Sequence, residues 1–170
     1  MNECFADHVH PNEKAATRIA QVVYRQLTGK EAPMHVSQPF PGHKGKWQGF
    51  DQYTFSYQGR QAIVVCPERA AAGNPWIWRP AFFGAFPSVD EALLKRGFHV
   101  AYYALTHLYG SPRARKLGTD FYWNMVQMYG FSPRVTLEGF SRGGLFAYNW
   151  AADHPDKVAC IYVDARFAMC

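Results

Sequence analysis

The segment at residues 135–144 constrains the fold of this chain most, because it predicts an apolar strand, a tight turn and a helix in immediate succession. A serine stands in the turn, within the pattern Gly139-Phe140-Ser141-Arg142-Gly143. Where a strand turns directly into a helix, the two backbones approach closely, and a side chain two residues before or after the serine would collide with its surroundings. Glycine has no Cβ, so Gly139 and Gly143 suit these two places.

Two kinds of site use such a turn. In the first, a serine hydroxyl stands clear above the end of a parallel sheet and acts as a nucleophile. In the second, a glycine-rich turn binds a phosphate at the N-terminus of the helix. The phosphate-binding patterns G-x-G-x-x-G and G-x-x-x-x-G-K-[ST] are both absent from the sequence. The sequence therefore favours Ser141 as a nucleophile.

Composition restricts the other classes of function. A chain of 170 residues with 48% apolar and 16% aromatic residues can bury the core of one domain. The net charge is +5, but the basic residues are scattered, so we expect no nucleic-acid partner. The sequence has neither an apolar run long enough for a membrane helix nor an evident signal peptide, so we expect a cytoplasmic protein. It has no metal-binding histidine or cysteine motif, and we expect no metal and no cofactor.

The order of predicted elements indicates an α/β fold. Short apolar strands alternate with helices, which predicts a mostly parallel sheet with helices on both faces and one antiparallel N-terminal strand. We expect an N-terminal helix and loop at residues 1–46 and the α/β core at residues 47–170. The predicted segments are helices at 12–27, 88–96, 112–129 and 145–152, strands at 47–57, 62–66, 100–105, 135–137 and 158–163, and loops at 33–46 and 67–87.

Several short segments together carry a resemblance to a known superfamily. They are Ile63-Val64-Val65-Cys66-Pro67, Pro75-Trp76-Ile77-Trp78-Arg79, Phe82-Phe83-Gly84, Gly97-Phe98-His99-Val100-Ala101-Tyr102 and Gly139-Phe140-Ser141-Arg142-Gly143-Gly144. On these residues the chain resembles the α/β-hydrolases from about residue 47 to its C-terminus. Within that superfamily it is similar to the bacterial hydrolases grouped with prolyl oligopeptidase and the acetyl-ester hydrolases.

The resemblance implies that Ser141 attacks the carbonyl carbon of a carboxylic ester or related acyl substrate and forms an acyl-enzyme. The backbone N–H of Arg142 and a second N–H near Glu68 would bind the oxyanion. Trp78 and Arg79 are candidates for the substrate pocket, although the aromatic residues of this loop would equally suit a cover over the sheet. We expect a small-molecule ester rather than a peptide, because the N-terminal segment is too short for the gating domain of the related peptidases.

The base and the acid of a catalytic triad are harder to assign. In this superfamily the order is serine, acid, histidine, and His154 is the only histidine after Ser141. It lies down the helix, roughly 20 Å from the serine, and suits a helix C-terminus better than a base. His107 follows the strand at 100–105 and could reach the site, but it precedes the serine in the chain. Asp164 directly follows the last strand and is a possible acid.

We expect the chain to be the N-terminal part of a longer hydrolase, inactive or impaired by itself, because it ends just after an apolar strand that would be left at a sheet edge. Two other functions stay open. One is a non-catalytic α/β module whose aromatic loop binds a ligand or a partner. The other is a phosphate or nucleotide site at the start of the helix after Ser141.

Overall fold

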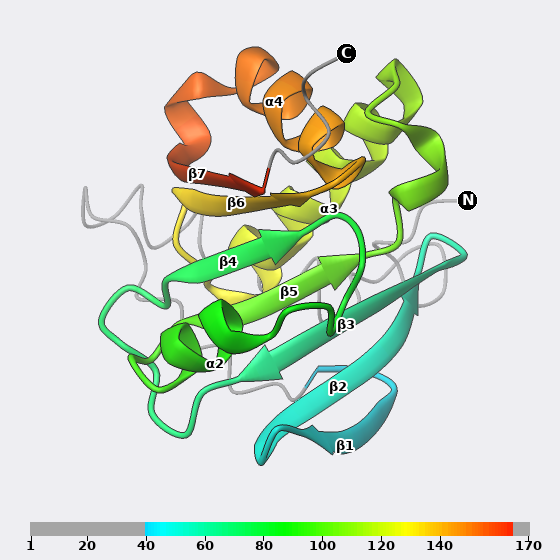
Figure 1. The fold of residues 1–170 in the computed structure, drawn as a ribbon. Coiled ribbons are helices and arrows are strands. Elements are labelled where there is room, and N and C mark those ends of the chain that lie inside the picture. Colours follow the sequence, from blue (N-terminus) through cyan, green and yellow to red (C-terminus); the bar gives the residue numbers. More distant parts are fainter. Residues whose placement is uncertain (1–39, 165–170) are drawn as a thin grey trace, which may run out of the picture. The chain divides into compact units, whose positions relative to one another are not determined.

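The structure, a computed structural model, describes residues 40–164 (Figure 1). The strands of this part are β1 (His43–Trp47), β2 (Phe50–Tyr57), β3 (Arg60–Cys66), β4 (Trp76–Arg79), β5 (His99–Tyr103), β6 (Val135–Phe140) and β7 (Val158–Asp164). The helices are α2 (Ser88–Leu94), α3 (Pro112–Tyr129) and α4 (Gly143–Asp153), with two short 3-10 helices, η1 (Thr106–Leu108) and η2 (Pro155–Lys157). The helix predicted at residues 12–27 lies outside the described residues.

The strands form one sheet in the order β1-β2-β3-β5-β4-β6-β7. β4 pairs in parallel with β5 and β6, and β6 pairs in parallel with β7, so these strands point the same way. β1, β2 and β3 form antiparallel pairs, and β3 also runs antiparallel to β5. The predicted α/β class is confirmed, but the antiparallel part of the sheet is larger than the one strand expected, because β1 and β3 both run against the main direction.

Two strands lie where the sequence predicts loops. β1 takes up the end of the predicted loop at 33–46, so the predicted boundary between residues 46 and 47 falls inside a strand. β4 lies within the predicted loop at 67–87 and has only 4 residues. A run this short shows no periodicity, but all of its side chains are buried, because β4 lies between β5 and β6. Position in the sheet, rather than local pattern, makes this segment a strand.

Helices cover both faces of the sheet (Figure 1). The smaller core layer lies between α2 and one face of β3, β4 and β5. Its buried apolar side chains are Ile63, Val65, Ile77, Leu94 and Val100.

The larger core layer lies between the opposite face and the helices α3 and α4, and it is rich in aromatic rings. Trp78 of β4 is fully buried in it. Its ring centroid lies 5.1 Å from that of Phe146 and 5.3 Å from that of Trp150, both on α4, and 5.7 Å from that of Phe121 on α3. Contacts of this kind contribute roughly 0.5–1.5 kcal/mol each beyond the burial of their area, so Trp78 fixes both helices against the centre of the sheet.

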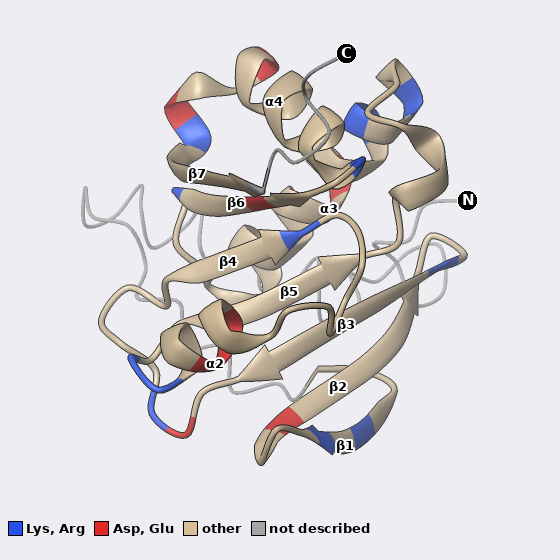
Figure 2. Ribbon diagram, in the orientation of Figure 1, with Lys and Arg blue, Asp and Glu red and all other residues tan. Residues whose placement is uncertain are grey.

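Charged residues are dispersed over the described elements, and Lys and Arg do not gather on one of them (Figure 2). Lys44 and Lys46, for example, form exposed ion pairs with Asp51 on the neighbouring strand. A basic residue buried in the sheet, Arg79, forms ion pairs with two acidic residues that are also buried. Within residues 40–164 no helix combines the length and the apolar character needed to cross a bilayer.

We expect the substitution Gly118→Ala to destabilise the protein. A Cβ at this position of α3 would lie 2.5 Å from Cζ of Phe146 and 3.0 Å from Cη2 of Trp78, and both rings are buried. Overpacking should outweigh the better helix propensity of alanine and lower the free energy of unfolding by about 1 kcal/mol or more, measured by urea denaturation. Arg113→Ala, at an exposed position of the same helix, is the control. Equal stability of the two variants would contradict the packing described.

Candidate active site

Ser141 lies in the turn between β6, which ends at Phe140, and α4, which begins at Gly143. Its φ is 49°, in the left-handed region, and its carbonyl oxygen accepts a hydrogen bond from the N–H of Gly144 at 2.9 Å. A residue with a side chain is strained in this conformation. Ser141 is partly exposed, and it follows the C-terminal end of β6, at the edge where the parallel strands β4, β5 and β7 also end.

The glycines on either side of Ser141 lie in crowded surroundings. A Cβ added at Gly139 would lie 2.6 Å from Cα of Gly144, at the start of α4, and 3.1 Å from a methyl carbon of Val163 on β7. A Cβ added at Gly143 would lie 3.1 Å from Cβ of Ala81. The strand, the helix and the neighbouring chain segments therefore approach one another closely only because these side chains are missing.

The segment that follows β4 borders this turn. The amide nitrogen of Ala81 lies 3.9 Å from the place that a Cβ on Gly143 would take. The guanidinium carbon of Arg142 lies 5.4 Å from the ring centroid of Phe82. Arg142 is the N-cap residue of α4, so the backbone amides of Ala81 and Arg142 both lie beside the Ser141 turn. Sequence reasoning missed Ala81, because it did not find β4.

Glu68 does not belong to this site, and its prediction as an oxyanion donor is wrong. It follows β3, and β3 runs antiparallel to β5, with Val65 opposite Val100 and Ala62 opposite Tyr103. The C-terminal end of β3 therefore lies at the sheet edge where β5 begins, opposite the edge that carries Ser141. The prediction assumed that the strand before Glu68 was parallel to the strand of the serine.

Aromatic side chains surround the turn on its exposed side. The rings of Phe86 and Phe140 stack with centroids 4.8 Å apart, and Phe86 is 69% exposed. The guanidinium of Arg142 lies over the ring of Tyr109 as well, and its Nη1 donates a hydrogen bond to the Tyr109 hydroxyl at 3.2 Å. An apolar rim with a single guanidinium therefore adjoins the serine.

Trp78 and Arg79 do not line a pocket, so this prediction is also wrong. Both side chains are 0% exposed, because β4 is an internal strand of the sheet with helices over both faces. Trp78 points into the aromatic core beside α3 and α4. Arg79, the next residue, belongs to a buried group of charged side chains.

In this buried group, Arg79 of β4 contacts acidic residues from two other elements. Its Nη1 donates to Oδ2 of Asp90 on α2, and its Nε lies 3.6 Å from Oε2 of Glu138 on β6. Asp90 and Glu138 are both buried. In Figure 2 the C-terminal end of β4 is blue, and α2 and β6 carry red segments, which mark acidic residues. Sequence reasoning did not find this group, because its members are far apart in the sequence.

The two carboxyl groups share one negative charge. Burial raises the pKa of Glu138 to about 8, and the charge of Asp90 raises the Glu138 pKa as well. Burial also raises the pKa of Asp90, but the Arg79 guanidinium opposes this rise. Asp90 Oδ1 and Glu138 Oε2 accept no hydrogen bond from a protein donor, and both carboxyl groups contact the same guanidinium. We therefore place the charge on Asp90, which Arg79 contacts directly, and the proton on Glu138.

Two histidines of the described residues lie away from Ser141. His99 begins β5, at the opposite sheet edge, where its ring packs on Phe131 with centroids 4.6 Å apart. Burial lowers the pKa of His99 to about 4, so it is neutral at pH 7. His154 is the C-cap residue of α4, at the helix end as predicted, and its Nε2 lies 2.9 Å from Oγ1 of Thr119. Burial lowers the pKa of His154 as well.

His107 and Asp164 follow strands that end on the same side as β6. His107 is an exposed residue of η1, which comes directly after β5. Asp164 is the last residue of β7 and pairs in register with Phe140, the residue before Ser141. The position of the Asp164 side chain lies outside what the structure describes, so its role as an acid stays a prediction. In the described part of the chain, no group of three His, Cys, Asp or Glu residues could hold a metal ion.

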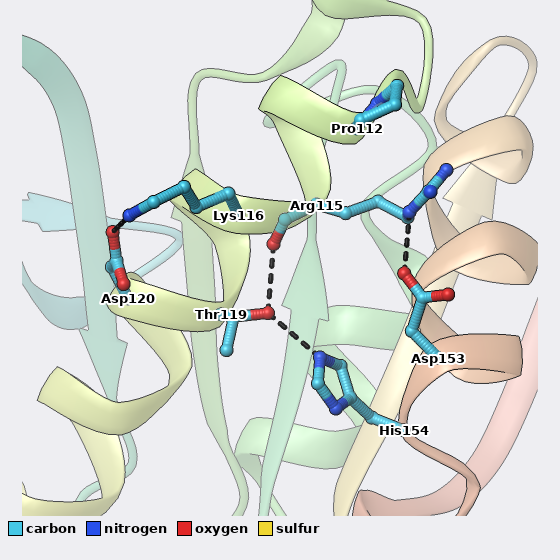
Figure 3. A pocket seen from close by; sticks show the side chains of 7 residues that line it. All are labelled: Pro112, Arg115, Lys116, Thr119, Asp120, Asp153 and His154. Atoms are coloured by element: carbon cyan, nitrogen blue, oxygen red, sulfur yellow. Dashed lines mark hydrogen bonds and ion pairs between the residues drawn. The ribbon is translucent and has the colours of Figure 1, made fainter.

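A hollow of about 350 Å³ lies between the first half of α3 and the C-terminal end of α4 (Figure 3). Its charged residues are paired with one another, Arg115 with Asp153 and Lys116 with Asp120. The hydroxyl of Thr119 donates to the carbonyl oxygen of Arg115. The hollow is at the end of α4 far from Ser141, and its charges are already satisfied, so we do not assign the chemistry to it.

Comparison with known proteins supports the fold. No family model and no curated protein matches the chain. A cold-adapted esterase from an Arctic intertidal metagenomic library is similar in its native structure, with a TM-score of 0.56 and 13% identity over 74% of this chain and 63% of that chain. Its PEG-bound complex gives a TM-score of 0.55 and 12% identity over 74% of this chain and 65% of that chain. The match spans less than two thirds of the esterase, and at this identity it shows the fold alone, which is the α/β-hydrolase fold.

Backbone strain at Ser141 predicts that Ser141→Gly will be more stable than Ser141→Ala. Glycine adopts a φ of 49° freely, whereas alanine keeps the steric cost of a Cβ. The difference in the free energy of unfolding should be about 1 kcal/mol by urea denaturation. The same pair of substitutions at Ser56, an exposed strand residue of β2, should give the opposite order. Greater stability of alanine at both positions would contradict strain at Ser141.

The buried proton predicts how stability depends on pH. Glutamate titrates at 4.5 in the unfolded chain and at about 8 here, so the folded state binds more protons between these values. The contribution of Glu138 to stability is therefore complete below about pH 4.5 and is lost as the pH rises through about 8. Glu138→Gln cannot ionise and should flatten the fall in melting temperature over this range. Glu68→Gln, at an exposed position after β3, should leave the wild-type curve unchanged. If Glu138→Gln also leaves it unchanged, Glu138 does not hold a proton in this pH range.

Proposed function

We propose that this chain is a serine hydrolase that cleaves a carboxylic ester or related acyl substrate through an acyl-enzyme on Ser141. The observation that carries the proposal is the strained Ser141 backbone, with a φ of 49° between β6 and α4. This conformation supports a nucleophile elbow, in which a sharp turn presents the serine hydroxyl above the sheet edge. Strain of this kind persists where it positions a reacting group.

The tetrahedral intermediate needs hydrogen-bond donors for its negatively charged oxygen. We assign one to the backbone N–H of Arg142, the residue after the nucleophile at the start of α4. We assign the other to the N–H of Ala81, the first amide after β4, because Pro80 has none. The closeness of Ala81 to Gly143 supports this assignment. Each donor of this type contributes on the order of 3 kcal/mol to lowering the barrier.

The exposed rim supports an ester with an apolar group. Phe86, Phe140 and Tyr109 present aromatic surface beside Ser141, and such surface favours contact with an acyl chain or an aromatic leaving group. We therefore prefer a small-molecule carboxylesterase, of the acetyl-ester or prolyl oligopeptidase-like kind, to a peptidase. The shared fold with an esterase agrees with this preference.

For the rest of the triad we propose Asp164 as the acid that orients the base, because it ends the strand next to β6. We do not assign the base to a histidine within residues 40–164. His99 and His154 lie away from the serine, and His107 would reverse the chain order of the superfamily.

The alternatives receive less support. A phosphate at the start of α4 would need free backbone amides and space, but the N–H of Gly144 already donates to Ser141 and Ala81 adjoins Gly143. A non-catalytic module would give no reason for strain at a serine, since glycine would adopt the same turn without cost. Binding of ATP that raises the melting temperature would favour the phosphate site instead.

The proposal predicts that a fluorophosphonate probe will label Ser141. The serine oxygen bonds to phosphorus as the P–F bond breaks and fluoride leaves, and the adduct mimics the tetrahedral intermediate. An activated serine should therefore react far faster than the other serines of the chain. Peptide mapping by mass spectrometry identifies the modified residue, and release of p-nitrophenol from p-nitrophenyl acetate reports turnover. Ser141→Ala should abolish both signals, and Ser111→Ala, at the N-cap of α3, should keep them. Because no base is assigned within residues 40–164, labelling is compared with that of a chain extended beyond residue 170. An unlabelled Ser141 in both would contradict the proposed function.

A further inference from the structure

The loop between β4 and α2, at residues 80–87, is held in a strained conformation. Phe82 and Phe86 have φ values of 53° and 51°, and Gly84 lies between them at 82°. Bulky residues adopt left-handed conformations only where their surroundings fix them. The same loop carries Ala81, so whatever fixes the loop also fixes the proposed oxyanion donor.

Arg79 bonds to the loop at its far end. Its Nη2 donates a hydrogen bond at 2.7 Å to the carbonyl oxygen of Ala85, beyond both Phe82 and Gly84. The Arg79 side chain is 0% exposed and Ala85 is partly buried, so the donor of this bond is shielded from water. Arg79, directly before the loop, therefore bridges Phe82 and Gly84, and Phe86 comes directly after the bonded Ala85.

The guanidinium is itself held by two other elements. Asp90 on α2 accepts a hydrogen bond from Nη1, and Glu138 on β6 lies 3.6 Å from Nε. Glu138 is also part of the strand that leads directly into Ser141. Arg79 therefore connects the loop of the proposed oxyanion donor to the strand of the proposed nucleophile.

We propose that Arg79, held by Asp90 and Glu138, is a positioning residue that sets the loop at 80–87, and with it the Ala81 amide, relative to Ser141. It does not touch the substrate. The effect of Arg79 on catalysis rests on the proposed function of Ser141. The fixing of the loop by Arg79 rests only on the hydrogen bonds described here.

The proton shared by Asp90 and Glu138 belongs to this arrangement. With one carboxyl group protonated, the buried group has one cation and one anion. The charged or titratable neighbours that face it are Arg79 from β4, Asp90 and Glu91 from α2, Glu138 from β6, and Tyr102, which pairs in register with Arg79 from β5. Loss of the proton adds a second buried anion, which would pull the guanidinium toward Glu138 and weaken its bond to the loop.

Amide hydrogen exchange measured by mass spectrometry tests the fixing of the loop without any chemistry at Ser141. Arg79→Lys keeps the positive charge but loses the fork that reaches Asp90 and Ala85 together. In the segment 81–86 the Ala85 N–H donates a hydrogen bond to the Phe82 carbonyl oxygen at 3.1 Å. Exchange of this amide should become about tenfold faster or more, the factor expected for loss of a hydrogen bond from a charged group. Exchange in α3 should change little.

Tyr122→Phe is the matched control for a general loss of stability. It removes another part-buried hydrogen bond, from the Tyr122 hydroxyl to the carbonyl oxygen of Pro133 at 2.6 Å, on the other face of the sheet. It should leave exchange at residues 81–86 unchanged. If Arg79→Lys and Tyr122→Phe accelerate exchange over the whole chain alike, Arg79 is structural only and the inference is overturned.

Glu138→Gln is the second variant, because an amide can still donate to Asp90 but cannot ionise. Wild-type protein should lose exchange protection at residues 81–86 and label more slowly with the fluorophosphonate as the pH rises through about 8. Glu138→Gln should show neither change after correction for the intrinsic pH dependence of exchange and of the probe. The same profile in both proteins would overturn the role of the shared proton.

The two proposals fail in different ways. If Ser141 is labelled neither in this chain nor in a chain extended beyond residue 170, but Arg79→Lys frees the loop, the proposed function is wrong and the fixing of the loop stands. If wild type is labelled and Arg79→Lys labels at the same rate with the loop still protected, the proposed function stands and the positioning role is wrong.

Discussion

The close approach of β6 and α4 is the constraint on which the rest of the site depends. A Cβ on Gly139 would lie 2.6 Å from the backbone of Gly144, so only a residue without a side chain permits the strand to turn into the helix at this distance. Because the turn is this tight, Ser141 takes a left-handed conformation. The turn also brings the first amides of α4 to the sheet edge. The position of the serine and the direction of the helix therefore follow from one steric condition.

Sequence reasoning succeeded where the information is local. The turn at Ser141 was predicted because glycine, serine and flanking strand and helix formers stand side by side. β4 was missed because 4 residues between two prolines carry no periodicity, and burial in the sheet decides their structure. This one omission moved the expected oxyanion donor to Glu68, since the loop after β3 was taken for the loop that borders the serine. Strand order depends on contacts between distant segments, which local patterns do not record.

The same limit explains the interpretation of Arg79. An arginine next to tryptophans in a long loop suggests a pocket, because arginine is seldom buried. Here it is 0% exposed, and its charge is balanced by Asp90 on α2, while protonated Glu138, on a strand much later in the chain, contacts it as well. A buried ionic group of this kind costs desolvation free energy, and replacement by apolar residues is often neutral or stabilising. The presence of this buried group near the Ser141 edge of the sheet is therefore better explained by its holding of the neighbouring segments than by a gain in folding stability.

β4 shows how a short strand can control both sides of the serine. Adjacent residues of a strand point to opposite faces of the sheet. Trp78 packs against Phe146 and Trp150 of α4, the helix that follows Ser141. Arg79 reaches Glu138 of β6, the strand that precedes Ser141. Two consecutive side chains therefore fix the elements before and after the serine, and the backbone continues directly into Ala81. The same strand also supports the loop beside the nucleophile, because Arg79 donates a hydrogen bond to the carbonyl oxygen of Ala85.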